Sequence, residues 1–318
     1  MPMRHNLQQA SLKAVRNKVC LVELDCHTTS SAIGNSNTIE LLTSALALCH
    51  GEILTPYSQD WNCHLGACRD IVNSKTTNEN SKCSSNPIVD MLVKEVTHLE
   101  AFQDVSAITK SPTVLAIPGY TSVFDGFTHF LYEVTMHERQ HFTILKNGQP
   151  KPIIDMRAWQ HELDQAFQMH TVTRPSILHG QDKVKDSVIT VIRAQYYANL
   201  IYSYQALADD SKAIQMIRTS TSQLYHELTI IATSSISSLA HNIFWPLFIA
   251  GTEATDEGSQ DLVEALLNNC IYITGFWCNN LALQFLRGYW KNINRGYKKT
   301  WIQYARQYQH SIAPFLVF

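Results

Sequence analysis

The chain has 318 residues and a formal net charge of −2 at pH 7, from 25 basic and 27 acidic residues. This near balance excludes the general cationic surface that many nucleic-acid-binding proteins present. Hydrophobic residues make up 45% of the chain and charged residues only 16%, which excludes an intrinsically disordered protein. We therefore expect a folded chain whose apolar residues form a core and, in addition, a partner surface or an internal pocket.

Membrane and export signals are not found in the sequence. No apolar run approaches the roughly 18 residues of a membrane-spanning helix, and the N-terminal stretch MPMRHNLQQASLKAVRNK lacks the apolar centre of a signal peptide. We expect no membrane contact and an intracellular location, in the cytoplasm or the nucleus. Six of the eight cysteines lie between Cys20 and Cys83. No pair has the Cys-x-x-Cys spacing of a zinc knuckle, so free thiols are expected.

Helical periodicity begins near residue 37, in NTIELLTSALALCHGE, and recurs through the first third of the chain. The apolar residues of that stretch fall on one helical face: Ile39, Leu42, Leu46 and Cys49. Further helices are expected over 61–72 and 88–102. The polar segment 73–87 between them has no periodicity and predicts an exposed loop.

The remainder of the chain also predicts helices and shows no alternating strand, internal repeat or glycine-rich phosphate loop. Their expected ranges are 122–145, 155–170, 186–208, 211–233, 236–254, 258–275, 277–292 and 297–310. The segment 186–208 has a single charged residue, Arg193, after its first position, so we expect a buried central helix there. The sequence therefore predicts an all-α multi-helix bundle, with 1–36 as an N-terminal extension and 37–318 as a single helical domain.

One motif suggests a metal. His137-Glu138-Arg139-Gln140-His141 has the spacing of zinc protease helices, in which two imidazoles one turn apart bind the metal and the glutamate deprotonates a water. A charged arginine stands before the second histidine, and no local third ligand follows. We interpret the motif as a polar, solvent-exposed helix face and predict neither a metal site nor a zinc protease.

The stretch FWPLFIAGTEATDEGSQDLVEALL, residues 244–267, has unusual backbone chemistry. Pro246 cannot donate its amide, so a helix running through it is expected to kink. Gly251 would allow a neighbouring helix to approach closely. Glu253 is either structural, bonded to backbone or to an arginine, or faces a cavity as a proton-handling group.

Two segments together resemble the fungal-specific transcription factor domain, the regulatory domain of fungal zinc-cluster factors. They are ELLTSALALCHGEI…SQDWNCHLGACRDIV and the stretch 244–267, and FLRGYW is similar to a later helix of the family. The resemblance spans about residues 38–292 and implies the family's helical fold. It departs from the family in one respect, because no six-cysteine zinc cluster or basic linker precedes the domain here.

The resemblance, with that departure, suggests a stand-alone helical protein that binds an apolar small-molecule metabolite. We expect a cofactor-independent cyclase or isomerase, of the pericyclase type, in fungal secondary metabolism. The candidate catalytic residues are His64, His241 and Glu253. The candidate substrate-binding residues are Trp61, Trp245 and Phe248.

The alternative is a transcriptional regulatory protein that acts through a DNA-binding partner. In either case we expect no cofactor and no direct specific binding to DNA. A homodimer or a regulatory protein partner is compatible with the sequence, and a decayed gene product is a third alternative.

Overall fold

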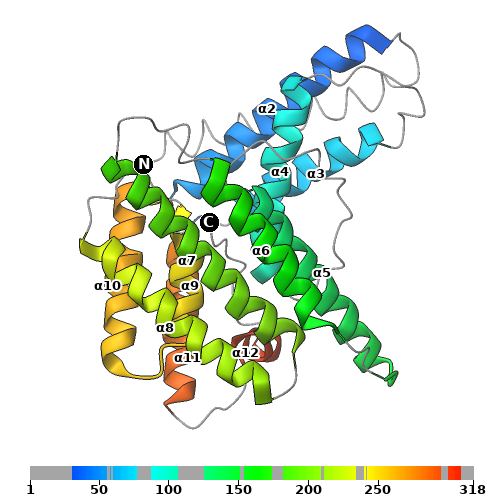
Figure 1. Cartoon of the computed structure of the whole chain (residues 1–318). Helices are drawn as coiled ribbons and strands as arrows, with labels where there is room; N and C mark the ends of the chain where they lie inside the picture. The colour runs from blue at the N-terminus through cyan, green and yellow to red at the C-terminus, as the bar shows by residue number, and fades with distance from the viewer. Residues whose placement is uncertain are drawn as a thin grey trace. The chain divides into compact units, whose positions relative to one another are not determined.

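Most of the residues whose structure is described lie in helices. The computed structural model describes residues 31–55, 58, 60–76, 87–106, 125–150, 154–173, 182–208, 211–233, 240, 242–294 and 300–308. Their regular structure consists of eleven helices, α2 to α12, and these described residues contain no strand (Figure 1). The predicted all-α fold is confirmed.

The packing divides the chain into two compact units, Met1–Glu100 and Ala101–Phe318. The prediction that 37–318 form a single domain stays a prediction. The first described helix begins at Ser31, six residues before the expected boundary. Weak helix formers such as Gly34 hide this first turn from a periodicity argument.

The first unit contains α2 (Ser31–Ile53), α3 (Trp61–Thr76) and α4 (Pro87–Ser106), whose last turn lies beyond the division. Helices α2 and α3 pack against each other. Their shared core consists of fully buried side chains: Leu42, Cys49, Ile53, Trp61, Leu65 and Cys68. Helix α4 is attached by an ion pair between Arg69 and Glu100 and by a contact of 3.1 Å between His50 Nε2 and Glu95 Oε1. Helix α3 runs to Thr76, past the expected start of a loop at 73, and most of that loop lies outside the described residues.

The second unit contains the remaining eight of the described helices. They are α5 (Asp125–Lys146), α6 (Met156–Thr173), α7 (Asp182–Leu207), α8 (Ser211–Thr233), α9 (Phe244–Thr252), α10 (Glu257–Thr274), α11 (Asn279–Ile293) and α12 (Trp301–Gln307).

Helix α7 is the central helix of this unit, as its composition predicts. It packs against α5, α6, α8 and α9 (Figure 1). The side chains of Val191, Ile192, Ala198 and Ile201 are completely buried, whereas Arg193 is half exposed. Among the described helices, α7 included, none is long and apolar enough to cross a membrane.

Helix α9 begins later than predicted. The sequence predicts a helix over 236–254 with a kink at Pro246. Helix α9 begins at Phe244, so Pro246 lies in its first turn, where no helical partner for its amide is needed and no kink arises. The carbonyl oxygen of Asn242, which Pro246 cannot bond, accepts a hydrogen bond of 2.5 Å from the Gln195 side-chain amide. Residues 236–239 and 241 of the expected helix lie outside the described part of the chain.

The ends of α10 and the start of α12 follow from local sequence. Asp256 caps α10 by accepting a hydrogen bond of 2.9 Å from the Ser259 amide, and Gly275 ends that helix with a φ of 70°. Thr300 and Gln303 form a capping box at the start of α12. These signals fix where α12 begins and therefore which of its residues face the core.

Candidate functional site

Two of the predicted substrate-binding residues lie together in the core of the second unit. The Trp245 and Phe248 rings of α9 are stacked with centroids 6.1 Å apart, and both side chains are buried. Tyr202 packs edge-on against Trp245 at 5.3 Å, and Trp301 packs edge-on against Phe248 at 5.2 Å. The rings therefore fill the space around one another.

Glu253 follows α9 directly and lies beside this aromatic cluster. Its Oε1 accepts a hydrogen bond of 2.5 Å from the Gln205 side-chain amide, whose own carbonyl accepts one of 2.8 Å from the Trp301 indole. Burial raises the pKa of Glu253 from about 4.5 to about 7, against the opposing effect of the Gln205 hydrogen bond. The carboxyl group therefore exchanges a proton near neutral pH. Its partner is a side-chain amide, which is neither of the structural partners, backbone or arginine, considered from the sequence.

The C-terminal end of α9 is held by side chains from two other helices. The Trp290 indole of α11 donates to the Gly251 carbonyl at 2.7 Å, and the Tyr225 hydroxyl of α8 donates to the Ala250 carbonyl at 3.0 Å. The Gly251 α-carbon faces Leu286 so closely that a Cβ there would lie 2.6 Å from Leu286 Cδ1. The predicted close approach at Gly251 is confirmed, and it fixes the position of Glu253.

Trp61 and His64 belong to the first unit, on α3, and both are buried. Burial lowers the pKa of His64, while the carboxylates of Glu52 and Asp60 act in the opposite direction. The structure thus brings Trp245, Phe248 and Glu253 together, and it places Trp61 and His64 with one another in a different unit. His241 lies outside the described residues. The catalytic and binding roles of all six stay predictions.

The His-x-x-x-His motif on α5 does not form the exposed face that we predicted. Glu138 is buried, and both of its carboxylate oxygens accept hydrogen bonds from Arg306 of α12. His141 is also buried, and the half-buried His137 ring packs edge-on against Trp159 at 4.9 Å. The prediction of solvent exposure is wrong because the counter-ion lies 168 residues away, beyond the reach of a local pattern. Among the described residues no group of three or more His, Cys, Asp or Glu side chains is placed to hold a metal ion.

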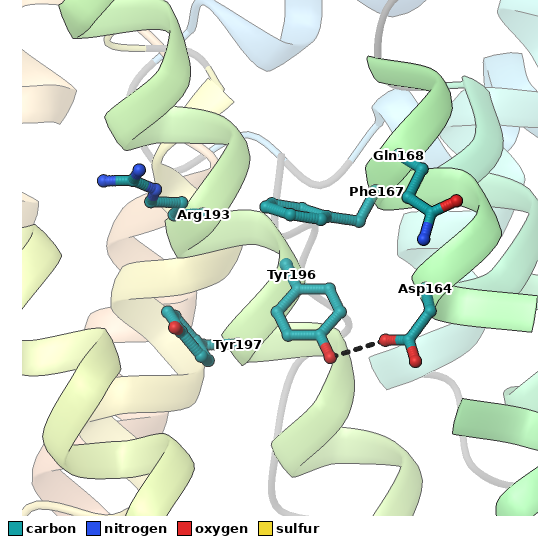
Figure 2. A pocket seen from close by; sticks show the side chains of 6 residues that line it. All are labelled: Asp164, Phe167, Gln168, Arg193, Tyr196 and Tyr197. Atoms are coloured by element: carbon teal, nitrogen blue, oxygen red, sulfur yellow. Dashed lines mark hydrogen bonds between the residues drawn. The ribbon is translucent and has the colours of Figure 1, made fainter. Parts of the chain in front are cut away.

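A cavity of about 290 Å³, partly open to solvent, lies between α6 and α7. Figure 2 shows Asp164, Phe167 and Gln168 on one side and Arg193, Tyr196 and Tyr197 on the other. The Tyr196 hydroxyl donates a hydrogen bond of 2.7 Å to Asp164 Oδ1. Burial and the Asp164 carboxylate raise the pKa of Tyr196, so this phenol stays neutral at physiological pH.

None of the cavity's residues was predicted from the sequence to be a site residue, although Arg193 was noted as the single charged residue within the expected central helix. The adjacent tyrosines and the lone arginine of α7 were the available signal, because a half-exposed polar position on an otherwise buried helix needs a neighbour or a ligand. Identifying the opposite wall would have required the pairing of α6 with α7, which the sequence alone does not give.

A comparison with protein families matches residues 153–315 to the family described as fungal specific transcription factor domain. The match covers just over half of the chain and includes the cavity, the aromatic cluster and Glu253. The segment 38–72, which also carried the resemblance, lies outside the matched residues. No curated protein and no solved structure matches the sequence.

Proposed function

Because the chain belongs to the fungal specific transcription factor domain family, we propose that its second unit is a ligand-binding domain whose small-molecule site is the cavity between α6 and α7. The observation that carries the proposal is the lining of this cavity. Three aromatic rings and a Tyr196–Asp164 hydrogen bond surround a space of about 290 Å³. Ligand pockets typically combine apolar walls with a few placed polar groups and span about 300–1,000 Å³. The volume suits a ligand smaller than a typical drug.

The cavity lies on the central helix of the family-matched region. Tyr196 and Tyr197 directly precede the buried Ala198, so a ligand in the cavity would contact a helix that also packs against α5, α8 and α9. Binding would therefore stabilise the fold of the whole unit, and ligand binding to the native state raises the melting temperature by linkage.

The test is a fragment screen by thermal shift, with hits confirmed by calorimetry. We expect fragments that raise the melting temperature of the wild type, with the effect lost in Phe167→Ala and kept in Tyr272→Ala. Tyr272 is the control because it is an aromatic residue on α10 that is 82% exposed. Hits that bind equally to both variants would place the ligand elsewhere and contradict the proposal.

A second candidate is cofactor-free catalysis, an isomerisation or cyclisation of an apolar metabolite in fungal secondary metabolism. It is favoured by Glu253, whose pKa of about 7 suits a general acid or base at physiological pH. Proton exchange at carbon tests it without a known substrate. In D₂O, wild-type protein should catalyse deuterium incorporation into some members of a panel of lipophilic enolisable ketones. Glu253→Gln should not, and equal incorporation by both proteins would contradict this role.

The regulatory alternative, action through a DNA-binding protein partner, is favoured by exposed apolar side chains at the end of α10. Ile273 and Trp277 are 42% and 37% exposed, and Trp is enriched in interface hot spots. The chain alone should give no sequence-selective shift of duplex DNA at physiological salt. Selective binding by the chain alone, at nanomolar concentration, would contradict an indirect mode of action.

A further inference from the structure

We propose that the cavity between α6 and α7 takes a cationic ligand, an alkylammonium or quaternary ammonium group; this inference rests on the proposed binding function and adds the ligand's chemical class. The residues that line the cavity support this proposal, because three aromatic rings and one carboxylate surround the same small space.

The rings meet at angles and do not stack in parallel. The Tyr196 centroid lies 4.9 Å from that of Phe167 with an interplanar angle of 52°, and 5.3 Å from that of Tyr197 with an angle of 76°. Rings inclined in this way can present their faces to a common centre. Because aromatic faces carry partial negative charge, such an arrangement attracts a cation, and quaternary ammonium groups are recognised in this manner.

Asp164 supplies the full negative charge. Its Oδ1 accepts from Tyr196 at 2.7 Å, and a carboxylate has about four acceptor positions in all. The same hydrogen bond orients the Tyr196 ring. A neutral ligand that filled the cavity would cover this carboxylate without balancing its charge, which is unfavourable. An ammonium group would pair with it.

Arg193 is the positive charge at the cavity, and its placement limits its effect. Figure 2 shows its guanidinium pointing away from Phe167 and Asp164. It lies 3.9 Å from the buried Glu227 carboxylate, and half of its side chain is exposed to solvent. Solvent and Glu227 therefore screen a charge that would otherwise repel a cation. Removing it should strengthen cation binding.

The experiment uses the whole chain and two isosteric probes, choline and its neutral carbon analogue 3,3-dimethyl-1-butanol, with benzoate as an anionic probe. Affinities are measured by ligand-observed NMR titration. We expect choline to bind about tenfold more tightly than the neutral isostere. Asp164→Asn and Tyr197→Leu should remove most of this preference, whereas Arg193→Gln should increase it several-fold and Tyr272→Ala should leave it unchanged.

The outcomes separate the ligand class from the binding function. One contrary result is that choline binds no more tightly than its isostere, and another is that benzoate binds more tightly than choline. If Phe167→Ala abolishes that binding, the result would overturn the cationic class and leave the binding site in place. Failure of every probe and every fragment to bind would overturn both. Circular dichroism and the melting temperature of each variant identify any that has lost its fold, and Tyr196→Phe then replaces Tyr197→Leu as the milder change.

Discussion

Gln205 donates its side-chain amide to Glu253 across 2.5 Å, and this contact joins the end of the central helix α7 to the residue that follows α9. The indole of Trp301 fixes the amide's orientation, because an indole nitrogen can only donate and therefore faces the Gln205 carbonyl oxygen. The amide N–H groups must then point to Glu253. Three segments distant in sequence thus share one polar chain inside an aromatic core.

The first prediction concerns the pH dependence of stability. Burial raises the pKa of Glu253 from about 4.5 to about 7, so the neutral carboxyl is the form that suits the folded state. The resulting stabilisation is fully present below pH 4.5 and is lost as the pH rises through 7. Glu253→Gln should flatten this part of the pH profile and raise the unfolding free energy at pH 8 by about 2–3 kcal/mol relative to wild type.

Urea denaturation at pH 5, 6, 7 and 8 measures the effect. The exposed Asp261→Asn on α10 is the matched control and should follow the wild-type profile. A Glu253→Gln profile parallel to that of wild type would mean that Glu253 is ionised in the folded protein throughout this range.

The second prediction concerns the buried ion pair of Glu138 and Arg306. Their side chains are only 11% and 16% exposed, so Arg306→Leu leaves a buried carboxylate without its counter-ion. We expect a loss of about 3–5 kcal/mol, with part of it recovered in the double variant Glu138→Leu/Arg306→Leu. The control is the exposed pair of Arg287 and Glu264, where Arg287→Leu should cost about 1 kcal/mol or less.

Chemical denaturation of wild type, Glu138→Leu, Arg306→Leu and the double variant gives a double-mutant cycle for the buried pair. Equal losses for Arg306→Leu and Arg287→Leu would show that the Glu138 carboxylate remains solvated when α12 is in place.

The third prediction concerns the contact of α9 with α11. A Cβ at Gly251 would lie 2.6 Å from Leu286 Cδ1 and 3.2 Å from Val263 Cγ1, both in the core. Gly251→Ala should therefore destabilise the protein by about 1–3 kcal/mol, and Leu286→Ala in the same chain should relieve the clash. Gly66→Ala on α3 has nothing within 4 Å of its new Cβ; it should be neutral or stabilise by up to about 1 kcal/mol. Thermal unfolding distinguishes the two, and a stabilising Gly251→Ala would contradict the packing described.

The fourth prediction concerns metal content. Both oxygens of Glu138 are engaged by Arg306, so this carboxylate is not available to deprotonate a metal-bound water. Untagged protein dialysed against a chelator should contain far less than one zinc per chain by elemental analysis. One zinc per chain that survives dialysis and is lost in His141→Ala would contradict this prediction.

Local signals in the sequence predicted the elements well, and long-range contacts explain where prediction failed. The helix expected over 211–233 matches α8. Helix α10 begins after Asp256 and ends before Gly275, so each of its ends lies within one residue of the expected range 258–275. These features depend on caps and periodicity, which act within a few residues. The prediction of a solvent-exposed face around Glu138 was wrong. Charged residues on a helix predict solvent exposure only when no oppositely charged residue from a distant segment, here Arg306 of α12, pairs with them.

The candidate site shows the same limit. The family resemblance singled out the segment that contains Trp245 and Phe248, and the structure places their ring centroids 6.1 Å apart. The sequence could not predict that Gln205 lies beside Glu253, because the two residues are 48 positions apart and no motif contains both. The cavity residues of α6 and α7 were missed for the same reason.

The pairing of Glu138 with Arg306 also has a consequence for biosynthesis. The two residues are 168 positions apart, and at roughly 5–20 residues per second the ribosome needs about 10–30 s to add the second after the first. During that interval α5 is complete, and its carboxylate must remain hydrated, because no counter-ion from α12 exists yet. Burying this face early is therefore unfavourable, and closure of the second unit is favoured only after α12 has emerged. A chaperone that shields α5 would have to release it at that late step.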